Sequence, residues 1–332
     1  MDECRYDVVG IGNAIVDIIA RCDDAKLDRL GLPKGHMRLI GEDDVVSLYK
    51  EMGPAVEVSG GSAANTMTGI ASLGGKSAFV GKVSDDEFGR IFRHDIRAAD
   101  VSFEVPLAEN DAPTARSLIF VTPDGERTMN TFLGVSPLLN NGEIDPTLIA
   151  QSKITYLEGY LFDRDEAKQA FHQAARIARE AGRKVSLSLS DSFCVDRHRQ
   201  EFLNLIRERV DLLFANEEEI CALYGTKDFA TACDRVAEDA DLAAVTRGAA
   251  GCVVITRGEM IEVSPDPVEE VVDTTGAGDL YAAGFLHGLA RGLDMRTCAR
   301  LAGVAAAEII SHIGARPENR LIRVAREKGL PV

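Results

Sequence analysis

A regular alternation of strand-like and helix-like segments constrains the fold of this 332-residue chain more than any other feature. Short apolar segments that favour strands occur at residues 77–80, 154–157, 185–189, 212–215, 243–246 and 252–256. Longer segments with a helical pattern lie between them, at residues 164–181, 196–209, 217–223 and 229–240. Strands that alternate with helices across short loops form a parallel sheet with helices on both faces. We therefore expect an α/β fold, a three-layer sandwich with a mainly parallel central sheet.

One region departs from this alternation and predicts a β hairpin. Residues 115–121 and 126–132 both favour strands. They flank Thr122-Pro123-Asp124-Gly125, which is a strong turn signal because its residues suit the tight backbone bend. The sequence therefore places an antiparallel pair inside an otherwise strand–helix pattern.

The N-terminal segment is also rich in β-forming residues. A buried-type strand at residues 6–12 is followed by a second strand-like run at 15–20. We expect segments of about 16–40 and 113–134 to form a small β-rich lid inserted in the large α/β part of a single domain, residues 1–332.

Composition excludes several classes of protein. The formal net charge of −16 argues against a nucleic-acid partner, which would require a basic face. The seven cysteines are scattered without a Cys-x-x-Cys pair, which is typical of reduced thiols in a cytosol. No segment reaches the ~18 apolar residues of a membrane span, and the N-terminus lacks a signal-peptide pattern. We expect a soluble, cytoplasmic enzyme with a small-molecule substrate, no nucleic-acid or membrane partner, and either a monomeric or a homodimeric state.

Residues 273–279, with the sequence DTTGAGD, form the most informative local motif. The motif precedes an Ala- and Leu-rich helical segment, so its free N–H groups and the helix dipole would form an anion site. Gly276 and Gly278 would let the backbone approach a phosphate closely because they carry no side chain. Asp279 would repel that phosphate unless it faced an incoming hydroxyl, and its position therefore favours phosphoryl transfer. The alternative is an ordinary glycine-containing turn with an acidic residue in the first helical turn.

A second glycine-rich cluster supports the first interpretation. Residues 58–65, VSGGSAAN, read as a loop that precedes a helix at 66–74, and residues 74–89 continue the pattern. Together with residues 273–279, these segments resemble the two signature regions of the ribokinase-like (PfkB) family of carbohydrate and nucleoside kinases. The resemblance extends from the first strand to Gly314, and it is closest to the adenosine kinase branch. It implies a ribokinase-like fold.

The resemblance also implies roles for residues on the acceptor side. Asp279 would be the base, and the amides of Gly276, Ala277 and Gly278 would form the anion hole. In the adenosine kinase branch, the ribose is held by residues that match Asn13, Asp17, Gly60, Gly61 and Asn65 of this chain.

Aromatic residues beyond two strand ends are candidates for binding a base. Tyr160 and Phe193 lie where ligands of open α/β sheets bind, and together with Ile15, Leu39 and Phe132 they could stack against a purine. For each aromatic residue taken alone, packing in the core is the alternative.

On the nucleotide side, the resemblance implies that Asn216 and Glu219 order Mg²⁺ through water. The alternative is an ordinary acidic helix start, which explains Glu217 and Glu218 through the helix dipole and Asn216 as an N-cap. It further implies contacts with ATP from residues matching the family motifs, namely Thr246, Arg247, Gly248, Thr275 and His312. Arg247 is a candidate phosphate clamp. Many family members bind a monovalent cation such as K⁺, but Glu318 stands where ribokinase-type sequences tend to carry Ser.

These observations lead us to expect an ATP- and Mg²⁺-dependent kinase that phosphorylates the 5′-hydroxyl of adenosine to give AMP. A ribokinase- or fructokinase-like sugar kinase is the first alternative, and a catalytically silent nucleoside-binding protein is the second. A dinucleotide-binding fingerprint at residues 10–15 is disfavoured because its third glycine is missing and a strand-like segment follows.

Overall fold

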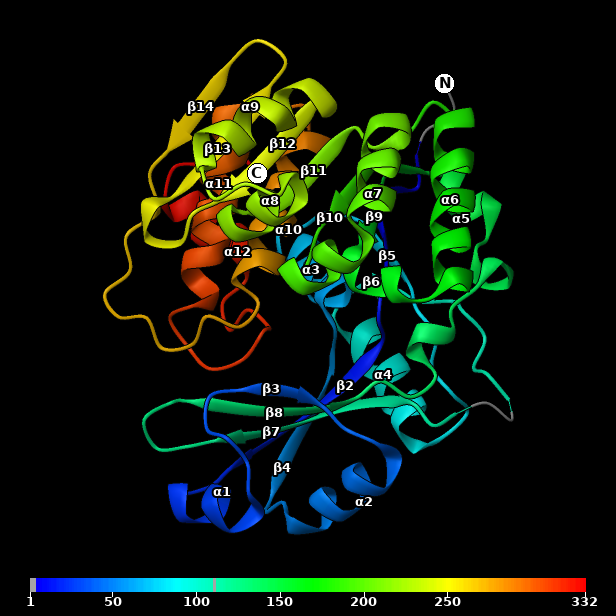
Figure 1. The fold of residues 1–332 in the computed structure, drawn as a ribbon, viewed down its shortest axis with the longest axis vertical. Helices are drawn as coiled ribbons and strands as arrows, with labels where there is room; N and C mark the ends of the chain where they lie inside the picture. Colours follow the sequence, from blue (N-terminus) through cyan, green and yellow to red (C-terminus); the bar gives the residue numbers. More distant parts are fainter. Residues whose placement is uncertain (1–3, 110–111) are drawn as a thin grey trace.

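The computed structural model describes residues 4–109 and 112–332, and it contains two sheets (Figure 1). The larger sheet has nine strands in the order β14-β13-β12-β11-β10-β9-β1-β5-β6. Its strands are β1 (Tyr6–Ile11), β5 (Ser77–Val80), β6 (Val101–Ser102), β9 (Ser152–Glu158), β10 (Lys184–Ser188), β11 (Leu212–Asn216), β12 (Leu242–Thr246), β13 (Cys252–Thr256) and β14 (Met260–Val263). Neighbouring strands are parallel except at the β12–β13 and β13–β14 pairs. The predicted mainly parallel sheet is confirmed, with the difference that β13 and β14 form an antiparallel edge.

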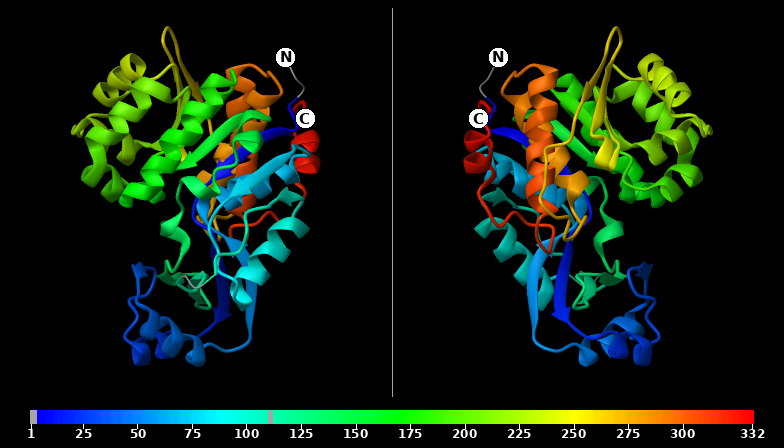
Figure 2. Two further views of the ribbon diagram at one scale, coloured as in Figure 1. Left: turned by 90° about the vertical axis from the view of Figure 1, so that its right-hand side faces the viewer. Right: turned by 90° about the vertical axis from the view of Figure 1, so that its left-hand side faces the viewer.

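Helices cover both faces of the larger sheet, as the three-layer prediction requires (Figures 1 and 2). One face carries α3 (Ser62–Ser72), α10 (Ala277–Ala290) and α11 (Met295–Ile309), with α12 (Leu321–Glu327) packed beside them. The other face carries α5 (Pro146–Ala150), α6 (Asp165–Glu180), α7 (Ser192–Arg209), α8 (Glu217–Tyr224) and α9 (Phe229–Asp239). Across residues 4–109 and 112–332, every helix is too short or too polar to cross a membrane.

The smaller sheet lies beyond one end of the larger domain (Figure 1). Its order is β3-β8-β7-β2-β4, and β7 and β8 form the predicted antiparallel hairpin. The strands are β2 (Ile15–Arg21), β3 (Met37–Leu39), β4 (Ala55–Gly60), β7 (Ala115–Val121) and β8 (Arg127–Phe132). The helices α1 (Asp24–Leu30), α2 (Glu42–Glu51) and α4 (Glu87–Ala98) complete this end of the molecule. That the sheet moves as a lid stays a prediction.

The interpretation of residues 58–65 as a loop is wrong in part. Residues 58–60 belong to β4, and α3 begins at Ser62 rather than at Thr66. β4 pairs antiparallel with β2, which places Gly60 opposite Ile15. A Cβ atom at Gly60 would lie 2.4 Å from Oδ2 of Asp17. The glycine in this strand therefore marks a close approach of a carboxylate to the backbone.

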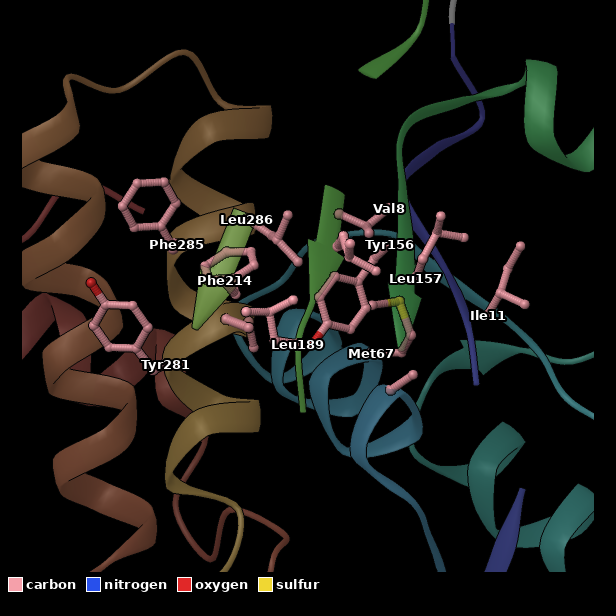
Figure 3. Packing of buried hydrophobic residues seen from close by; sticks show 14 of the residues in the cluster. Val8, Ile11, Met67, Tyr156, Leu157, Leu189, Phe214, Tyr281, Phe285 and Leu286 are labelled. Carbon is pink, nitrogen blue, oxygen red and sulfur yellow. The ribbon is translucent and has the colours of Figure 1, made fainter. Parts of the chain in front are cut away.

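The packed core of the larger domain fixes the position of α10. Phe214 of β11 packs edge-on against Tyr281 and Phe285 of that helix (Figure 3). On the opposite side, a Cβ atom at Gly284 would lie 2.6 Å from the Cα atom of Ala302 on α11. A third contact joins α10 to α3, where a Cβ atom at Gly69 would lie 2.7 Å from Cβ of Ala283. Because three neighbours enclose it so tightly, α10 presents its first turn in a fixed place.

Candidate functional site

Two adjoining cavities lie at the junction of the sheets. The inter-sheet cavity, of about 780 Å³, is bounded by the smaller sheet on one side and by the larger domain on the other. The α10 cavity, of about 290 Å³, lies on the larger domain at the start of α10. Ser62, Tyr160 and Thr275 line both cavities, so the two spaces meet at these residues.

The predicted site residues divide between the two cavities. Those in the wall of the inter-sheet cavity are Asn13, Asp17, Gly61, Asn65, Tyr160 and Phe193. Those in the wall of the α10 cavity are Asn216, Glu219, Thr246, Thr275, Gly276, Gly278 and Asp279. The structure therefore brings most of the predicted acceptor-side residues into one space and most of the predicted nucleotide-side residues into the other.

Asp279 lies in the first turn of α10, and two residues of α3 hold its carboxylate. Ser62 Oγ donates to Oδ1 at 2.6 Å, and Asn65 Nδ2 donates to Oδ2 at 2.9 Å. Burial raises the pKa of Asp279 above its usual range, while these hydrogen bonds and the positive charge of Arg316 oppose the rise. Gly276, the N-cap residue, has a φ of 79°, a left-handed conformation that suits glycine. The helix start is thus built to present a carboxylate held in one orientation.

The geometry gives Asn65 a second task beside the predicted contact with a ribose. Its amide nitrogen is occupied by Asp279, whereas Oδ1 has no hydrogen-bond partner among the described residues. Asn65 is only 5 % exposed, and a buried amide oxygen without a partner is costly. A ligand hydroxyl that reached this oxygen would supply the missing hydrogen bond.

Asp17 faces the inter-sheet cavity from β2, in the smaller sheet. Burial raises the pKa of Asp17 to about 6, against the opposing charges of Arg127 and Arg316, while the negative charge of Asp279 adds to the rise. Asp17 and Asp279 therefore sense each other's charge from opposite sides of the junction. Two carboxylates so placed can receive hydrogen bonds from hydroxyl groups of one small molecule.

Two arginines that the sequence analysis did not single out as site residues support these carboxylates. Arg316 donates to the carbonyl oxygen of Ser59, to the hydroxyl of Thr68 and, at 3.2 Å, to the carbonyl oxygen of Ala64. Burial lowers its pKa to about 10, and the charges of Asp95, Asp17 and Asp279 oppose that change. Arg316 lies between His312 and Glu318 in the chain, the two residues of this region that the sequence analysis considered.

Arg127 is the second arginine, and it connects the smaller sheet to the glycine-rich loop. Its Nη1 donates to Oδ2 of Asp273 at 2.8 Å, and both side chains are buried. Asp273 also accepts the backbone N–H groups of Thr275 and Gly314, each at 2.9 Å. Nε and Nη2 of Arg127 have no partner among the described residues. A single ion pair thus joins the β8 strand to the loop that forms the start of α10.

Asn216 and Glu219 form a reciprocal helix cap at the start of α8. Asn216 Oδ1 accepts the N–H of Glu219 at 2.8 Å, and the Glu219 carboxylate accepts the Asn216 backbone N–H at 3.0 Å and its Nδ2 at 2.8 Å. The helix-cap interpretation is therefore borne out in the geometry. Burial raises the pKa of Glu219 to about 7.

These oxygens can accept from metal-bound water but are poorly placed for direct ligation. Carboxylate and amide oxygens suit Mg²⁺, which retains several of its waters. In the described part of the chain, no three His, Cys, Asp or Glu side chains are grouped as metal ligands. The donor set thus fits a hydrated ion that is held mainly by nucleotide phosphates.

Three predicted nucleotide contacts lie away from the cavity walls. The guanidinium of Arg247 donates to Oε2 of Glu217 at 2.9 Å and stacks over the ring of Phe229 at 4.2 Å. Gly248, next in the chain, begins a short 3₁₀ turn, and neither residue lines the two cavities. His312 Nε2 lies 3.2 Å from the buried carboxylate of Glu308. In this conformation the acidic start of α8 engages the guanidinium of Arg247, and the phosphate clamp stays a prediction. Ala277 carries its N–H in the first turn of α10, but its side chain lines neither cavity.

Two of the aromatic residues proposed to stack on a base are exposed rather than packed in the core, whereas Phe132 is partly buried against it. Phe193 is 72 % exposed and Tyr160 is 42 % exposed, and both line the inter-sheet cavity. Across that cavity, Met37 and Leu39 of β3 expose apolar side chains as well. Large apolar groups that face an open space, rather than a core, are typical of a ligand-binding surface.

Comparison with known proteins relates the chain to kinases. The family described as pfkB family carbohydrate kinase matches residues 38–320. The solved structure of adenosine kinase from Sinorhizobium meliloti is 53% identical, with a TM-score of 0.90, and the match covers 98% of this chain and 99% of that one. The structure of a probable sugar kinase protein from Rhizobium etli CFN 42 is 48% identical, with a TM-score of 0.92 and coverage of 99% and 100%.

Similar curated sequences include fructokinases. The probable fructokinase-6, chloroplastic, of Arabidopsis thaliana is 35% identical over 249 residues, which are 71% of this chain and 63% of that protein. The chain thus spans less than two thirds of that relative. A fructokinase from Klebsiella pneumoniae is 30% identical over 263 residues, covering 77% of this chain and 85% of that protein.

Proposed function

Because the chain belongs to the pfkB family of carbohydrate kinases, we propose that it transfers the γ-phosphoryl group of ATP to the 5′-hydroxyl of adenosine. One observation carries the proposal. Asp279, held by Ser62 and Asn65, stands at the start of α10 where the two cavities meet. A hydroxyl that enters from the inter-sheet cavity would meet a phosphate from the α10 cavity beside this carboxylate.

In the proposed reaction, Asp279 accepts the proton of the attacking hydroxyl. Its elevated pKa makes it a better base than an exposed aspartate, and the two hydrogen bonds from α3 keep it oriented. The N–H groups of Gly276 and Gly278 at the helix start would stabilise the negative charge of the transferring group. The N–H of Ala277 donates to the carbonyl oxygen of Thr274 at 3.2 Å and would join them only after leaving that acceptor. Phosphoryl transfer depends mainly on alignment and charge stabilisation, so these fixed groups can supply most of the catalysis.

Asp17 would bind two adjacent hydroxyls of the ribose from the opposite side. Mg²⁺, when bound with the nucleotide, would neutralise phosphate charge, with Asn216 and Glu219 contacting its water ligands. The free Oδ1 of Asn65 would accept a further hydroxyl. Movement of the smaller sheet toward the larger domain would exclude water from the reacting groups.

The size and lining of the inter-sheet cavity support a nucleoside over a free sugar. At about 780 Å³ the cavity is larger than a hexose requires, and its exposed Phe193, Tyr160 and Leu39 suit an aromatic base. The 53% identity to an adenosine kinase supports the same choice. A fructokinase activity is the second candidate, and the fructokinases among the similar sequences favour it.

An ADP-release assay with Mg·ATP tests the proposal. The acceptors are adenosine, inosine, cytidine, ribose and fructose, each across a concentration series. We expect turnover with adenosine at a kcat/KM at least tenfold above the others. Turnover confined to fructose or ribose would replace the substrate but keep the kinase. No turnover with any of the five, with adenosine binding detected by calorimetry, would favour a silent nucleoside-binding protein.

A further inference from the structure

A fully buried carboxylate, Glu158, lies at the end of β9 between the supports of Asp17 and Asp279. Its Oε1 accepts the backbone N–H of Asn13 at 3.1 Å and Nδ2 of Asn13 at 2.7 Å. Its Oε2 accepts the backbone N–H of Ala63 at 2.8 Å. The side chain has no exposed surface, and three N–H donors from two distant segments converge on it. Such a group is retained only where its hydrogen bonds compensate for the loss of water.

The two segments that Glu158 joins lead directly to the two candidate functional carboxylates. Asn13 lies where the chain leaves β1 of the larger sheet and enters β2 of the smaller sheet, which carries Asp17. Ala63 lies in the first turn of α3, the helix whose Ser62 and Asn65 hold Asp279. The positive end of the α3 dipole also favours a negative charge at this point.

The surroundings of Glu158 leave little freedom for the crossing between sheets. A Cβ atom at Gly12 would lie 2.3 Å from Oε2 of Glu158, so the backbone passes against the carboxylate. On its other side, Asn13 Oδ1 accepts from Ser136 Oγ at 2.9 Å, and Ser136 Oγ accepts the N–H of Ala14 at 2.9 Å. The Asn13 side chain is therefore held at both ends, and hydrogen bonds add to the apolar packing that holds the crossing.

We propose that Glu158 is a positioning residue for phosphoryl transfer, whose carboxylate locks the β1–β2 crossing to the start of α3 and so sets Asp17 opposite Asp279. This inference rests on the proposed kinase function of the same site. It assigns Asn13 chiefly to the hydrogen bonds with Glu158, with one hydrogen of its side-chain amide left for a substrate. Small displacements of reacting groups cost rate steeply, so loosening the lock lowers kcat.

The three hydrogen bonds that Glu158 accepts depend on its protonation state. A neutral carboxyl group gains an O–H donor and loses its negative charge, so it accepts more weakly from the three N–H groups that surround it. Burial raises the pKa of Glu158 to about 7; the hydrogen bonds from Ala63 and Asn13 oppose that rise, and the charge of Asp279 adds to it. The titratable groups that sense this carboxylate are Asp279 of α10, Tyr156 of β9 and Tyr160 of the adjoining 3₁₀ turn. Below neutral pH, the wild type should therefore behave as if the carboxylate were an amide.

The test compares the wild type with two variants. Glu158→Gln removes the titratable carboxylate, and Ser136→Ala is the matched variant, which removes the hydrogen bonds of Ser136 to Asn13 and Ala14 without changing a titratable group. Steady-state kcat and KM are measured from pH 5.5 to 8.5, with whichever acceptor the wild type phosphorylates best. For Glu158→Gln we expect kcat at pH 8.5 to fall by about 10- to 100-fold with little change in KM. The ratio of the wild-type kcat to the Glu158→Gln kcat should fall to a few-fold as the pH falls through about 7. Ionisations of Asp17 and Glu219 cancel in this ratio because both proteins carry them. Asp279 senses the charge of Glu158, so its ionisation is taken from the pH profile of each protein separately.

The outcomes separate this inference from the proposed function. Ser136→Ala should lower kcat by the same factor at every pH. A pH-independent ratio for Glu158→Gln, or a change in KM alone, overturns the inference, because the residue would then be a structural or substrate-contacting group. If thermal unfolding shows that Glu158→Gln is unfolded, an unchanged kcat for Ser136→Ala overturns it instead. A wild type inactive with every acceptor overturns the proposed function and the inference together, whereas an active wild type tests the inference by itself.

Discussion

Asp279 and Asp17 face the same site, but the elements that carry them differ in how tightly they are packed. Asp279 projects from α10, whose residues from Leu280 to Gly288 are all buried, so the helix is enclosed by the core. Asp17 projects from β2, where buried and partly exposed residues alternate because one face of the smaller sheet is open to the cavity. A helix enclosed by a core holds a reacting group in place, whereas a half-open sheet can adapt to a ligand. Under the proposed function, the larger domain would hold the reacting groups and the smaller sheet would recognise the acceptor.

The largest expected effect separates these two roles. Asp279→Asn removes the proposed base while keeping the shape of the side chain, and we expect kcat to fall by about 10²- to 10⁴-fold with a small change in KM. Asp17→Asn is the matched variant in the smaller sheet, and it should raise KM for the acceptor more than it lowers kcat. Steady-state kinetics with saturating Mg·ATP measure both. Equal effects on kcat from the two variants would contradict the division of roles.

The next effect concerns the ion pair that joins the two regions. Arg127→Met leaves the carboxylate of Asp273 buried without its cation, and breaking a buried pair costs about 3–5 kcal/mol. Urea unfolding followed by circular dichroism measures the loss. Lys34→Met is the control, because Lys34 pairs with Asp24 and Asp124 at the surface and its removal should change stability far less. A similar loss of unfolding free energy in both variants would show that the Arg127–Asp273 pair does not join the smaller sheet to the larger domain.

A smaller effect tests the rigidity of the support under Asp279. Gly284→Ala places a Cβ atom 2.6 Å from the Ala302 backbone, and such overpacking costs about 1–3 kcal/mol. Gly303→Ala in α11 is the control, because its Cβ atom would meet nothing nearer than 3.8 Å. That substitution should be neutral or stabilise the protein by up to about 1 kcal/mol, since alanine is the better helix former. Thermal or urea unfolding distinguishes the two, and equal stability would contradict the tight α10–α11 contact.

The smallest effect concerns recognition of a base. Phe193→Ala should leave the stability of the protein nearly unchanged because the ring is 72 % exposed. If the ring stacks on adenine, KM for adenosine should rise about tenfold, since one base–aromatic stack is worth about 1–3 kcal/mol. KM for ATP serves as the internal control and should stay constant. An unchanged KM for adenosine would remove this residue from the proposed purine site.

Many elements could be predicted from local sequence patterns. The strands 77–80 and 252–256 have the expected bounds, and the helix that follows residues 273–279 begins at Ala277. These predictions succeed because apolar periodicity, turn residues and glycine positions act within a few residues of one another. The strand β4 was missed because its glycines resemble a loop until the carboxylate of Asp17 is placed against them.

The supports of the candidate site lay beyond such patterns. Asn65 and Asp279 are 214 residues apart in the chain, and Asn13 and Glu158 are 145 apart. The contact between Arg247 and Glu217 likewise forms only because the ends of β11 and β12 lie side by side in the folded sheet. Charges and amides in a sequence show what they can bind, but only their neighbours in space decide which partner they take.

The sequence by itself determined the α/β class, the hairpin and the glycine-rich start of the helix that carries Asp279, because backbone preferences and apolar periodicity are local properties. Only the tertiary structure decided that β4 pairs with β2 in the smaller sheet. It also decided that Arg127, Glu158 and Arg316 surround the two carboxylates. The physical reason is that buried polar groups must find hydrogen-bond partners, and those partners come from whichever segments the packed core brings together.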